Sequence, residues 1–265
     1  MKIIQYVLWV NVLGVDAVMV ALCWQCTFAA VTQQEVSYAA AAVLGVSIWL
    51  TYTADRLFDV SKLPIQRLQT QRHRFAKCHA KRLWQLWWGL LILDIVLAWT
   101  RLTSEQFCGG IVLLMACLLY TGLNQKFAGR FFPKEGCVAG IFAGGVVVFL
   151  SFSPDMLVPL GLLAFLCLLN CLMISARESQ IDARMGTHSL AQSIPHMMPL
   201  LFVASLLLFI LLPLPWLLPF ATTYTLLLLL HLNRNRLSAE VFHLLADGAL
   251  ILGPAVGWLA TLIGK

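Results

Sequence analysis

Long runs of hydrophobic residues, separated by short polar segments, make up almost the whole chain. The runs are about 17 to 26 residues long, and roughly 20 apolar residues suffice for a helix to cross a bilayer core of about 30 Å. Glycine and proline mark turns between some of them, as at Ser153-Pro154-Asp155. The pattern predicts nine helices, at residues 5–30, 37–59, 83–100, 105–123, 136–152, 156–177, 194–212, 215–232 and 241–262.

Composition places these helices in a membrane. Hydrophobic residues make up 60% of the 265 positions and charged residues only 11%, against about 25% charged in a soluble domain. The deficit runs along the whole length, so we expect one all-α, polytopic membrane domain spanning residues 1–265. Membrane lipid is then a partner along most of its surface.

The basic residues indicate an orientation. If the N-terminus lies inside, 16 of the 18 Lys and Arg fall in segments on the inner side, and only Arg101 and Lys265 fall outside. An even number of spans would destroy this bias. The net charge of +6 is therefore mostly a topology signal and does not indicate nucleic acid. We expect an integral multi-pass protein, in the inner or plasma membrane of a bacterium, with the N-terminus and the acidic motifs on the cytoplasmic side.

Two acidic pairs stand out at inner helix ends. "YTADRLFD" (residues 52–59) ends the second predicted helix with Asp55 and Asp59, and the sixth helix runs into Glu178 and Asp182. Both pairs have i, i+4 spacing, which puts the two carboxylates on one helix face about 6 Å apart. Corresponding acids are separated by 123 positions in both cases. The helices are four spans apart, so the spacing also fits a four-helix internal repeat.

Four carboxylates around one cavity fit a magnesium site. Mg²⁺ prefers oxygen ligands and commonly bridges a few carboxylates to a substrate phosphate. One pair alone is better explained as a salt-bridged helix end, with Arg56 neutralising the acids of its own helix. Two pairs at matched depth favour a metal–diphosphate site. For the diphosphate itself, the basic candidates are Arg72, Arg74 and Lys126.

These motifs resemble the UbiA superfamily of intramembrane prenyltransferases. That family has nine helices around a central cavity, with an N-x-x-x-D-x-x-x-D motif on helix two and a D-x-x-x-D motif on helix six. Here the first motif reads Thr51, Asp55 and Asp59, with threonine in place of asparagine. The second begins with Glu178 in place of aspartate. It is followed by Gly186 and Ser189-Leu190, with Asn170 upstream.

The resemblance implies a function. Mg²⁺ would bridge the acids to the diphosphate of a prenyl donor, and the prenyl group would pass to an aromatic or other lipophilic acceptor. The basic loop after helix two would close over the diphosphate. The family also carries a Tyr and a Lys at the end of helix four, which "YTGLNQK" supplies as Tyr120 and Lys126. Asn170 joins these as a substrate-binding candidate.

Several further polar residues lie within the predicted spans, among them Asp16, Asp94, His243 and Asp247. Ionisable residues inside a membrane are functional candidates. His243 and Asp247 have i, i+4 spacing and either pair with each other or line the acceptor pocket and take up a proton. Asp16 and Asp94 lie toward the outer half of the bilayer or are protonated.

Two other functions stay open on the sequence. The chain is alternatively a non-catalytic UbiA-like lipid-binding or scaffold protein, which the departures at Thr51 and Glu178 allow. The third function is a cation-coupled transporter, in which repeat-related helices place acids beside a cavity. The cytoplasmic depth of the acids argues against transport, because transporter sites lie near the bilayer midplane.

Overall fold

The computed structural model describes residues 8–61, 63–126, 133–185 and 197–263, and the regular structure within these ranges is entirely helical. Residues 8–12 form a short helical segment. The longer helices are α2 (Val15–Val31), α3 (Tyr38–Ser61), α4 (Gln71–Cys78), α5 (Ala80–Arg101), α6 (Ser104–Lys126), α7 (Lys134–Val147), α8 (Leu157–Met185), α10 (Met197–Leu208), α11 (Leu214–Leu232) and α12 (Ala239–Ile263). Short 3₁₀ helices cover Ile65–Arg67, Pro154–Met156, Phe209–Leu211 and Arg234–Arg236.

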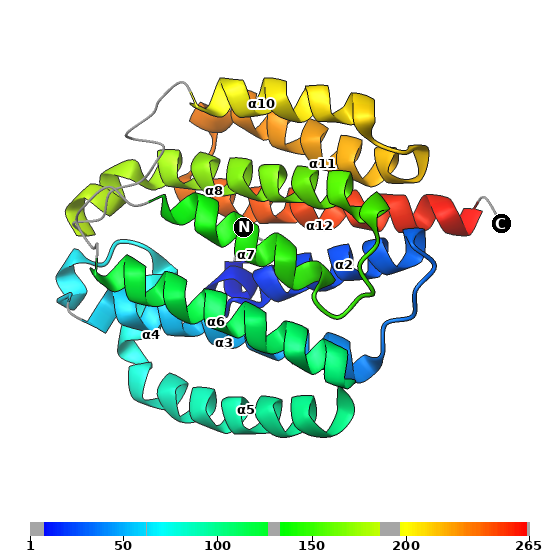
Figure 1. Cartoon of the computed structure of the whole chain (residues 1–265). Coiled ribbons are helices and arrows are strands. Elements are labelled where there is room, and N and C mark those ends of the chain that lie inside the picture. The colour runs from blue at the N-terminus through cyan, green and yellow to red at the C-terminus, as the bar shows by residue number, and fades with distance from the viewer. Residues whose placement is uncertain (1–7, 62, 127–132, 186–196, 264–265) are drawn as a thin grey trace.

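The long helices lie side by side with roughly parallel axes, from α10 and α11 at the top of Figure 1 to α5 at the bottom. Helix α8 runs through the middle and packs against α7, α10, α11 and α12. Its leucines, including Leu162, Leu166 and Leu169, are fully buried. Aromatic contacts join α2 to α11, where the ring centroids of Trp24 and Phe220 are 4.6 Å apart. The core therefore lies around α8, α2 and α11.

Within the described residues, a helix occupies each of the nine predicted ranges, but the first range is not one continuous helix. Gly14 has φ 71° and ends the segment 8–12 before α2 begins. This left-handed conformation suits glycine, which lacks a Cβ. The carbonyls freed by the break need new donors. The Gly14 N–H donates to the carbonyl of Asn11 (3.0 Å), and Arg56 Nη1 donates to the carbonyls of Asn11 (2.8 Å) and Val12 (3.1 Å).

The fifth predicted helix, 136–152, is shorter than expected, because α7 ends at Val147. The backbone that follows finds its partners in side-chain amides. Gln106 Nε2 donates to the carbonyl of Phe149 (2.9 Å). Gln34 exchanges two hydrogen bonds with the backbone of Ser151, at 2.7 and 2.8 Å. Apolar periodicity cannot reveal this ending, because the glutamines that permit it come from distant segments, Gln106 from α6 and Gln34 from the connection between α2 and α3.

Helix α4 was not among the predicted elements, since its sequence is polar and basic. Thr70 caps it: the hydroxyl accepts a hydrogen bond from the backbone N–H of His73 (3.4 Å). The helix packs against α3, and its Lys77 Nζ donates to the carbonyl of Val60 (2.8 Å). The segment expected to be a loop is therefore an ordered helix at one end of the bundle.

Five of these helices are long and apolar enough to cross a membrane, and they indicate a multi-pass membrane protein. They cover Ala80–Arg101, Ser104–Asn124, Pro154–Ser179, Leu214–Leu232 and Ala239–Leu259. Helices α5 and α6 bury little of their surface against the rest of the chain. Their outer faces carry large apolar side chains such as Trp99 and Val112, which are 74% and 70% exposed. Such a surface suits contact with lipid.

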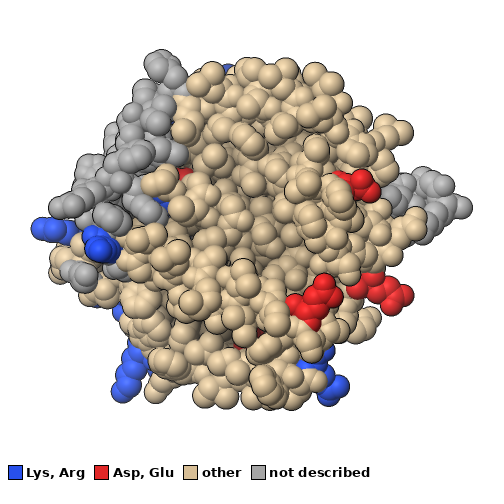
Figure 2. All heavy atoms as spheres, in the orientation of Figure 1, with Lys and Arg blue, Asp and Glu red and all other residues tan. Residues whose placement is uncertain are grey.

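Charged residues collect at the two ends of the bundle. In the face shown in Figure 2, most Lys and Arg lie on the left, acidic residues lie on the right with a basic group below them, and a wide, mostly uncharged band separates the two sides. The exposed acids Glu35, Glu105 and Asp155 lie in or next to the connections at the end away from α4. Such a band is what a bilayer core requires of a protein surface.

Helices α11 and α12 approach each other closely at small residues. A Cβ atom built on Gly253 would lie 2.6 Å from the carbonyl oxygen of Pro219 and still closer to the Thr223 hydroxyl. Thr223 Oγ1 donates to that carbonyl (3.0 Å). Any side chain at position 253 would therefore collide with the backbone of Pro219 as well as with the Thr223 hydroxyl.

We expect Gly253→Ala to destabilise the protein by about 1–3 kcal/mol, because overpacking forces helix α12 away from α11. Thermal unfolding of detergent-solubilised protein measures the effect. Gly161→Ala is the matched control, since a Cβ there meets no atom within 4 Å. An unchanged melting temperature for Gly253→Ala would contradict the close packing described here.

Candidate functional site

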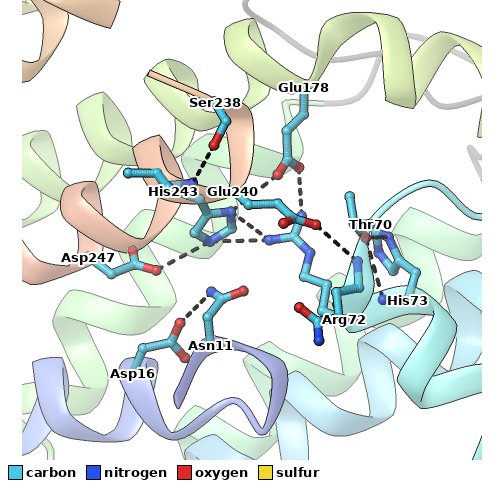
Figure 3. A network of polar contacts seen from close by, with 12 residues as sticks. Asn11, Asp16, Thr70, Arg72, His73, Glu178, Ser238, Glu240, His243 and Asp247 are labelled. Carbon is cyan, nitrogen blue, oxygen red and sulfur yellow. Dashed lines mark hydrogen bonds and ion pairs between the residues drawn. The ribbon is translucent and has the colours of Figure 1, made fainter. Parts of the chain in front are cut away.

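A buried polar network lies where α4, α8 and α12 meet, with Arg72 at its centre (Figure 3). Arg72 Nη2 contacts Glu178 Oε2 at 2.6 Å, and Nη1 lies 2.6 Å from His243 Nδ1. The side chains are largely buried, with 14% of Arg72 and 7% of Glu178 exposed. One guanidinium thus joins three helices that are far apart in the sequence.

Helix starts hold this network in position. Gln71, the first residue of α4, donates its backbone N–H to Glu240 Oε1 (3.2 Å), which lies in the first turn of α12. The Ser238 hydroxyl accepts from the backbone N–H of Val241 (3.3 Å) and caps α12. Because both helices begin beside each other, Arg72 in the first turn of α4 faces His243, one turn into α12.

His243 continues the network towards the bundle interior. A guanidinium has only donors, so the short Arg72 contact makes His243 Nδ1 an acceptor and places the ring proton on Nε2. That nitrogen lies 3.2 Å from Asp247 Oδ2. The predicted i, i+4 pairing of His243 with Asp247 is confirmed. Asn170, from α8, donates through Nδ2 to the other carboxylate oxygen of Asp247 (2.9 Å).

Asp16, on helix α2, lies beside His243 and Asp247 of α12. One donor atom each from Asp16, His243 and Asp247 lie within 4.8 Å of one another. The Asn11 side-chain amide donates to Asp16 Oδ2, and the backbone N–H of Ala17 donates to Oδ1 (2.9 Å). The sequence singled out these polar residues within the spans but gave no sign that Asp16 meets helix α12. Their position inside the predicted spans was the available signal.

The first acidic pair lies on α3, close to the same cations. The charges that act on Asp55 are those of Lys134, Arg56 and Arg72. Arg72 is therefore shared between Asp55 and Glu178, one acid from each predicted pair. Lys134, at the start of α7, was expected only to mark the inner side of the membrane. Arg56 acts on Asp55, as expected, but its hydrogen bonds go to the backbone of the segment 8–12.

Tyr120 and Asp59 lie near Asp55. Both Asp55 and Asp59 act electrostatically on the Tyr120 phenol, so the end of α6 faces the first acidic pair. Among the described residues, however, Asp55, Asp59 and Glu178 do not form a group of three ligands within 4.8 Å. The side chain of Asp182 lies outside the described part of the chain.

The remaining predicted residues lie apart from Arg72. Arg74 points to the 3₁₀ segment before α4, where its Nε donates to the carbonyl of Leu68 (2.7 Å). Lys126 is exposed at the end of α6. Asn170 is buried and bound to Asp247 instead of facing the acids of the two motifs. Of the basic candidates, only Arg72 contacts a predicted acid directly in the described structure.

The sequence matches no protein-family model, and searches of curated proteins and of solved structures give no match. The chemistry of the site therefore has to be argued from its own residues.

His73 makes the docking of α4 sensitive to acid. Its ring is buried, and Nδ1 lies 2.6 Å from the Thr70 hydroxyl. Burial, together with the positive charge of Arg72, lowers the pKa of His73 to about 3. A histidine in the unfolded chain titrates near 6.5. The neutral ring therefore stabilises the fold fully above pH 6.5, and this contribution is lost as the pH falls from 6.5 towards 3.

We expect acidification from pH 7.5 to 4.5 to weaken the docking of α4 by about 2–3 kcal/mol through His73 alone. Hydrogen exchange of the α4 amides in detergent micelles measures this loss. In His73→Gln, which cannot take up a proton, the α4 amides should lose most of this pH dependence. Equal acid sensitivity in the two proteins would show that another group is responsible.

Proposed function

We propose that this chain is a Mg²⁺-dependent intramembrane prenyltransferase of the UbiA type. It would move a prenyl group from a prenyl diphosphate to an aromatic or other lipophilic acceptor. The observation that supports this most is the position of Arg72, which bonds Glu178 and also acts on Asp55. Acids from both motifs thus share one cation, at the end of an apolar bundle where a lipid diphosphate would present its headgroup.

Arg72 is suited to bind the diphosphate by exchanging partners. The polar cavity beside Arg72, Glu178 and His243 has a volume of only about 10 Å³, too small for a diphosphate. A diphosphate offers several anionic oxygens to the forked donors of a guanidinium. Arg72 would move from Glu178 to these oxygens, and the Glu178 carboxylate would become available as a ligand. The ion pair therefore represents the closed form of the donor site.

The acids Asp55, Asp59, Glu178 and Asp182 would hold Mg²⁺, since carboxylate oxygens are the ligands this ion prefers. Glu178 is 6% exposed, and such a buried carboxylate needs a cation beside it. When bound, the ion would supply Lewis-acid stabilisation of the charge that develops on the leaving pyrophosphate. Arg72 would add hydrogen bonds to the same charge.

An apolar cavity of about 530 Å³ provides space for the prenyl chain. It lies between α2, α3, α4 and α5, and most of its lining is aliphatic or aromatic. Thr53 and Arg56 contribute its polar atoms on α3. Arg56 follows Asp55 in α3, so the Arg56 end of the cavity lies within one helical turn of the first acidic pair. The donor's chain would occupy this cavity with its diphosphate towards Asp55 and Arg72, and the apolar walls would keep water from the allylic cation.

A second candidate is a protein that binds a lipid without reacting it. The same 530 Å³ cavity supports it, and so does the closed state of the polar site around Arg72. A cation-coupled transporter would use the same acids for transport. Turnover of a prenyl diphosphate separates the proposed enzyme from both.

We expect membranes containing this protein to transfer a labelled prenyl group to one of a panel of aromatic acceptors, and to need Mg²⁺ for it. Asp55→Asn should lower kcat/KM about 100-fold or more, because metal stabilisation of a leaving group contributes several kcal/mol. Arg72→Lys should raise KM for the donor, since lysine keeps the charge but loses the bidentate fork.

Asp94→Asn is the matched control. Asp94 is also a buried aspartate in a membrane helix, but it bonds Ser47 (2.7 Å) and takes no part in the Arg72 network. Its activity should equal that of the unaltered protein. The proposal would be wrong if there were no Mg²⁺-dependent turnover and Asp55→Asn bound the donor as well as the unaltered protein.

We also propose that all nine helices span the membrane, with the N-terminus and α4 in the cytoplasm. The support comes from the basic residues around α4 and the exposed acids at the opposite end. An impermeant maleimide should then label Cys78, which is exposed at the end of α4, only from the cytoplasmic side. Glu35→Cys on a Cys78→Ser background should label only from the other side. The reverse pattern would invert the topology.

A further inference from the structure

We propose that Asp16, His243 and Asp247 form a binding site for a divalent transition-metal ion that joins helix α2 to helix α12. The site is separate from the acids assigned to the diphosphate, and it does not depend on the proposed reaction. It brings together two carboxylates and an imidazole from segments more than 200 positions apart in the sequence.

The spacing suits a single ion. One ligand atom from each residue lies within 4.8 Å of the other two. Bonds from a metal to imidazole nitrogen and carboxylate oxygen are about 2.0–2.2 Å, so three ligands around one ion lie about 3.3–3.8 Å apart. A movement of at most about 0.7 Å per side chain, which these bond lengths require, brings all three into contact with one ion.

Each of the three ligands already has a partner that orients it. Asp16 accepts from the Asn11 amide, and Asp247 accepts from Asn170 Nδ2 (2.9 Å). His243 Nδ1 lies 3.3 Å from Glu178 Oε1. Without an ion, Nδ1 accepts from Arg72 and the ring proton is on Nε2. For Nε2 to bind an ion, this proton would move to Nδ1 and be donated to Glu178 Oε1 in place of the Arg72 contact, which gives the carboxylate–histidine arrangement usual at metal sites.

A buried oxygen without a partner lies beside these residues. Asn170 is 6% exposed, and its Oδ1 has no hydrogen-bond partner in the described part of the chain. The amide group of Asn170 lies against Asp247, since its nitrogen bonds that carboxylate. Leaving a buried amide oxygen unsatisfied costs about 1–3 kcal/mol. A metal ion, or a water bound to it, would satisfy this oxygen.

Charge also favours a cation at this place. Two arginines approach the cluster. Arg72 bonds Glu178, and the charge of Arg56 acts on Asp16 as well as on Asp55. The two aspartates of the site face each other with a combined charge of −2 when both are ionised, which the single charge of Arg56 does not neutralise. A divalent ion neutralises both, whereas a shared proton neutralises one.

The mixture of donors indicates which kind of ion fits. Mg²⁺ prefers oxygen-only ligands, as the two acidic motifs offer. Imidazole together with carboxylates suits ions such as Mn²⁺, Fe²⁺ or Zn²⁺. The nitrogen ligand therefore distinguishes the two sites by spectroscopy, without any measurement of activity.

The test uses Mn²⁺ alone, added to tag-free full-length protein in nanodiscs, with no diphosphate present. Electron spin-echo modulation should detect one Mn²⁺ coupled to an imidazole nitrogen. Incorporation of ¹⁵N-histidine should change the modulation frequency, and this needs no substitution. His243→Gln should abolish the nitrogen coupling. Asp16→Asn should weaken Mn²⁺ binding about tenfold or more, the size of effect seen even for outer partners of metal sites.

Asp55→Asn is the control, because it alters the diphosphate acids but not this site, and the nitrogen coupling should persist in it. Three results would overturn the proposal. They are the absence of Mn²⁺ binding, binding through oxygen ligands alone, and nitrogen coupling that survives His243→Gln in a protein that elutes as a folded species. Each of these results would mean that no ion joins the two aspartates to His243, and that the aspartates share a proton instead.

Discussion

The ion pair between Arg72 and Glu178 is the interaction on which the arrangement of the polar end depends. A buried charge is costly unless a partner of opposite sign compensates it, and breaking such a pair costs about 3–5 kcal/mol. Here the partners come from α4 and α8, and the same guanidinium also contacts His243 on α12. Helix α4 is short and polar, so it has little apolar surface with which to hold itself in place. Its position follows largely from this arginine and from the cap at Thr70.

The sequence was sufficient to place the apolar helices, because they depend on local patterns, whereas the polar helix α4 has no such pattern. Apolar runs of the right length predict membrane helices, and the i, i+4 spacing of Asp55 and Asp59 needs no tertiary information. The break at Gly14 was missed for a different reason. A glycine in an apolar run is compatible with a continuous helix, so the sequence does not reveal the break. In the structure Gly14 is left-handed, and Arg56, from another helix, donates to a carbonyl beside the break.

The site was predictable only in part, because its geometry is set by contacts between distant segments. Arg72 was one of several basic candidates in its loop, and nothing local distinguishes it from Arg74. What separates them is that Arg72 lies in the first turn of a capped helix beside the start of α12, while Arg74 turns back to the carbonyl of Leu68. The meeting of Asp16 with Asp247 likewise depends on how α2 packs on α12, which no residue pattern encodes.

The contact between Arg56 and the segment 8–12 also has a consequence for how the chain is assembled in the membrane. Carbonyl groups without donors are poorly tolerated in lipid, at several kcal/mol each. The side-chain donor for the carbonyl of Val12 lies more than 40 residues later in the chain, near the end of α3. The first segment therefore takes its final conformation only once α3 has been made and packs beside it. Folding of the N-terminal end is completed by the second helix of the α2–α3 pair and not by the first.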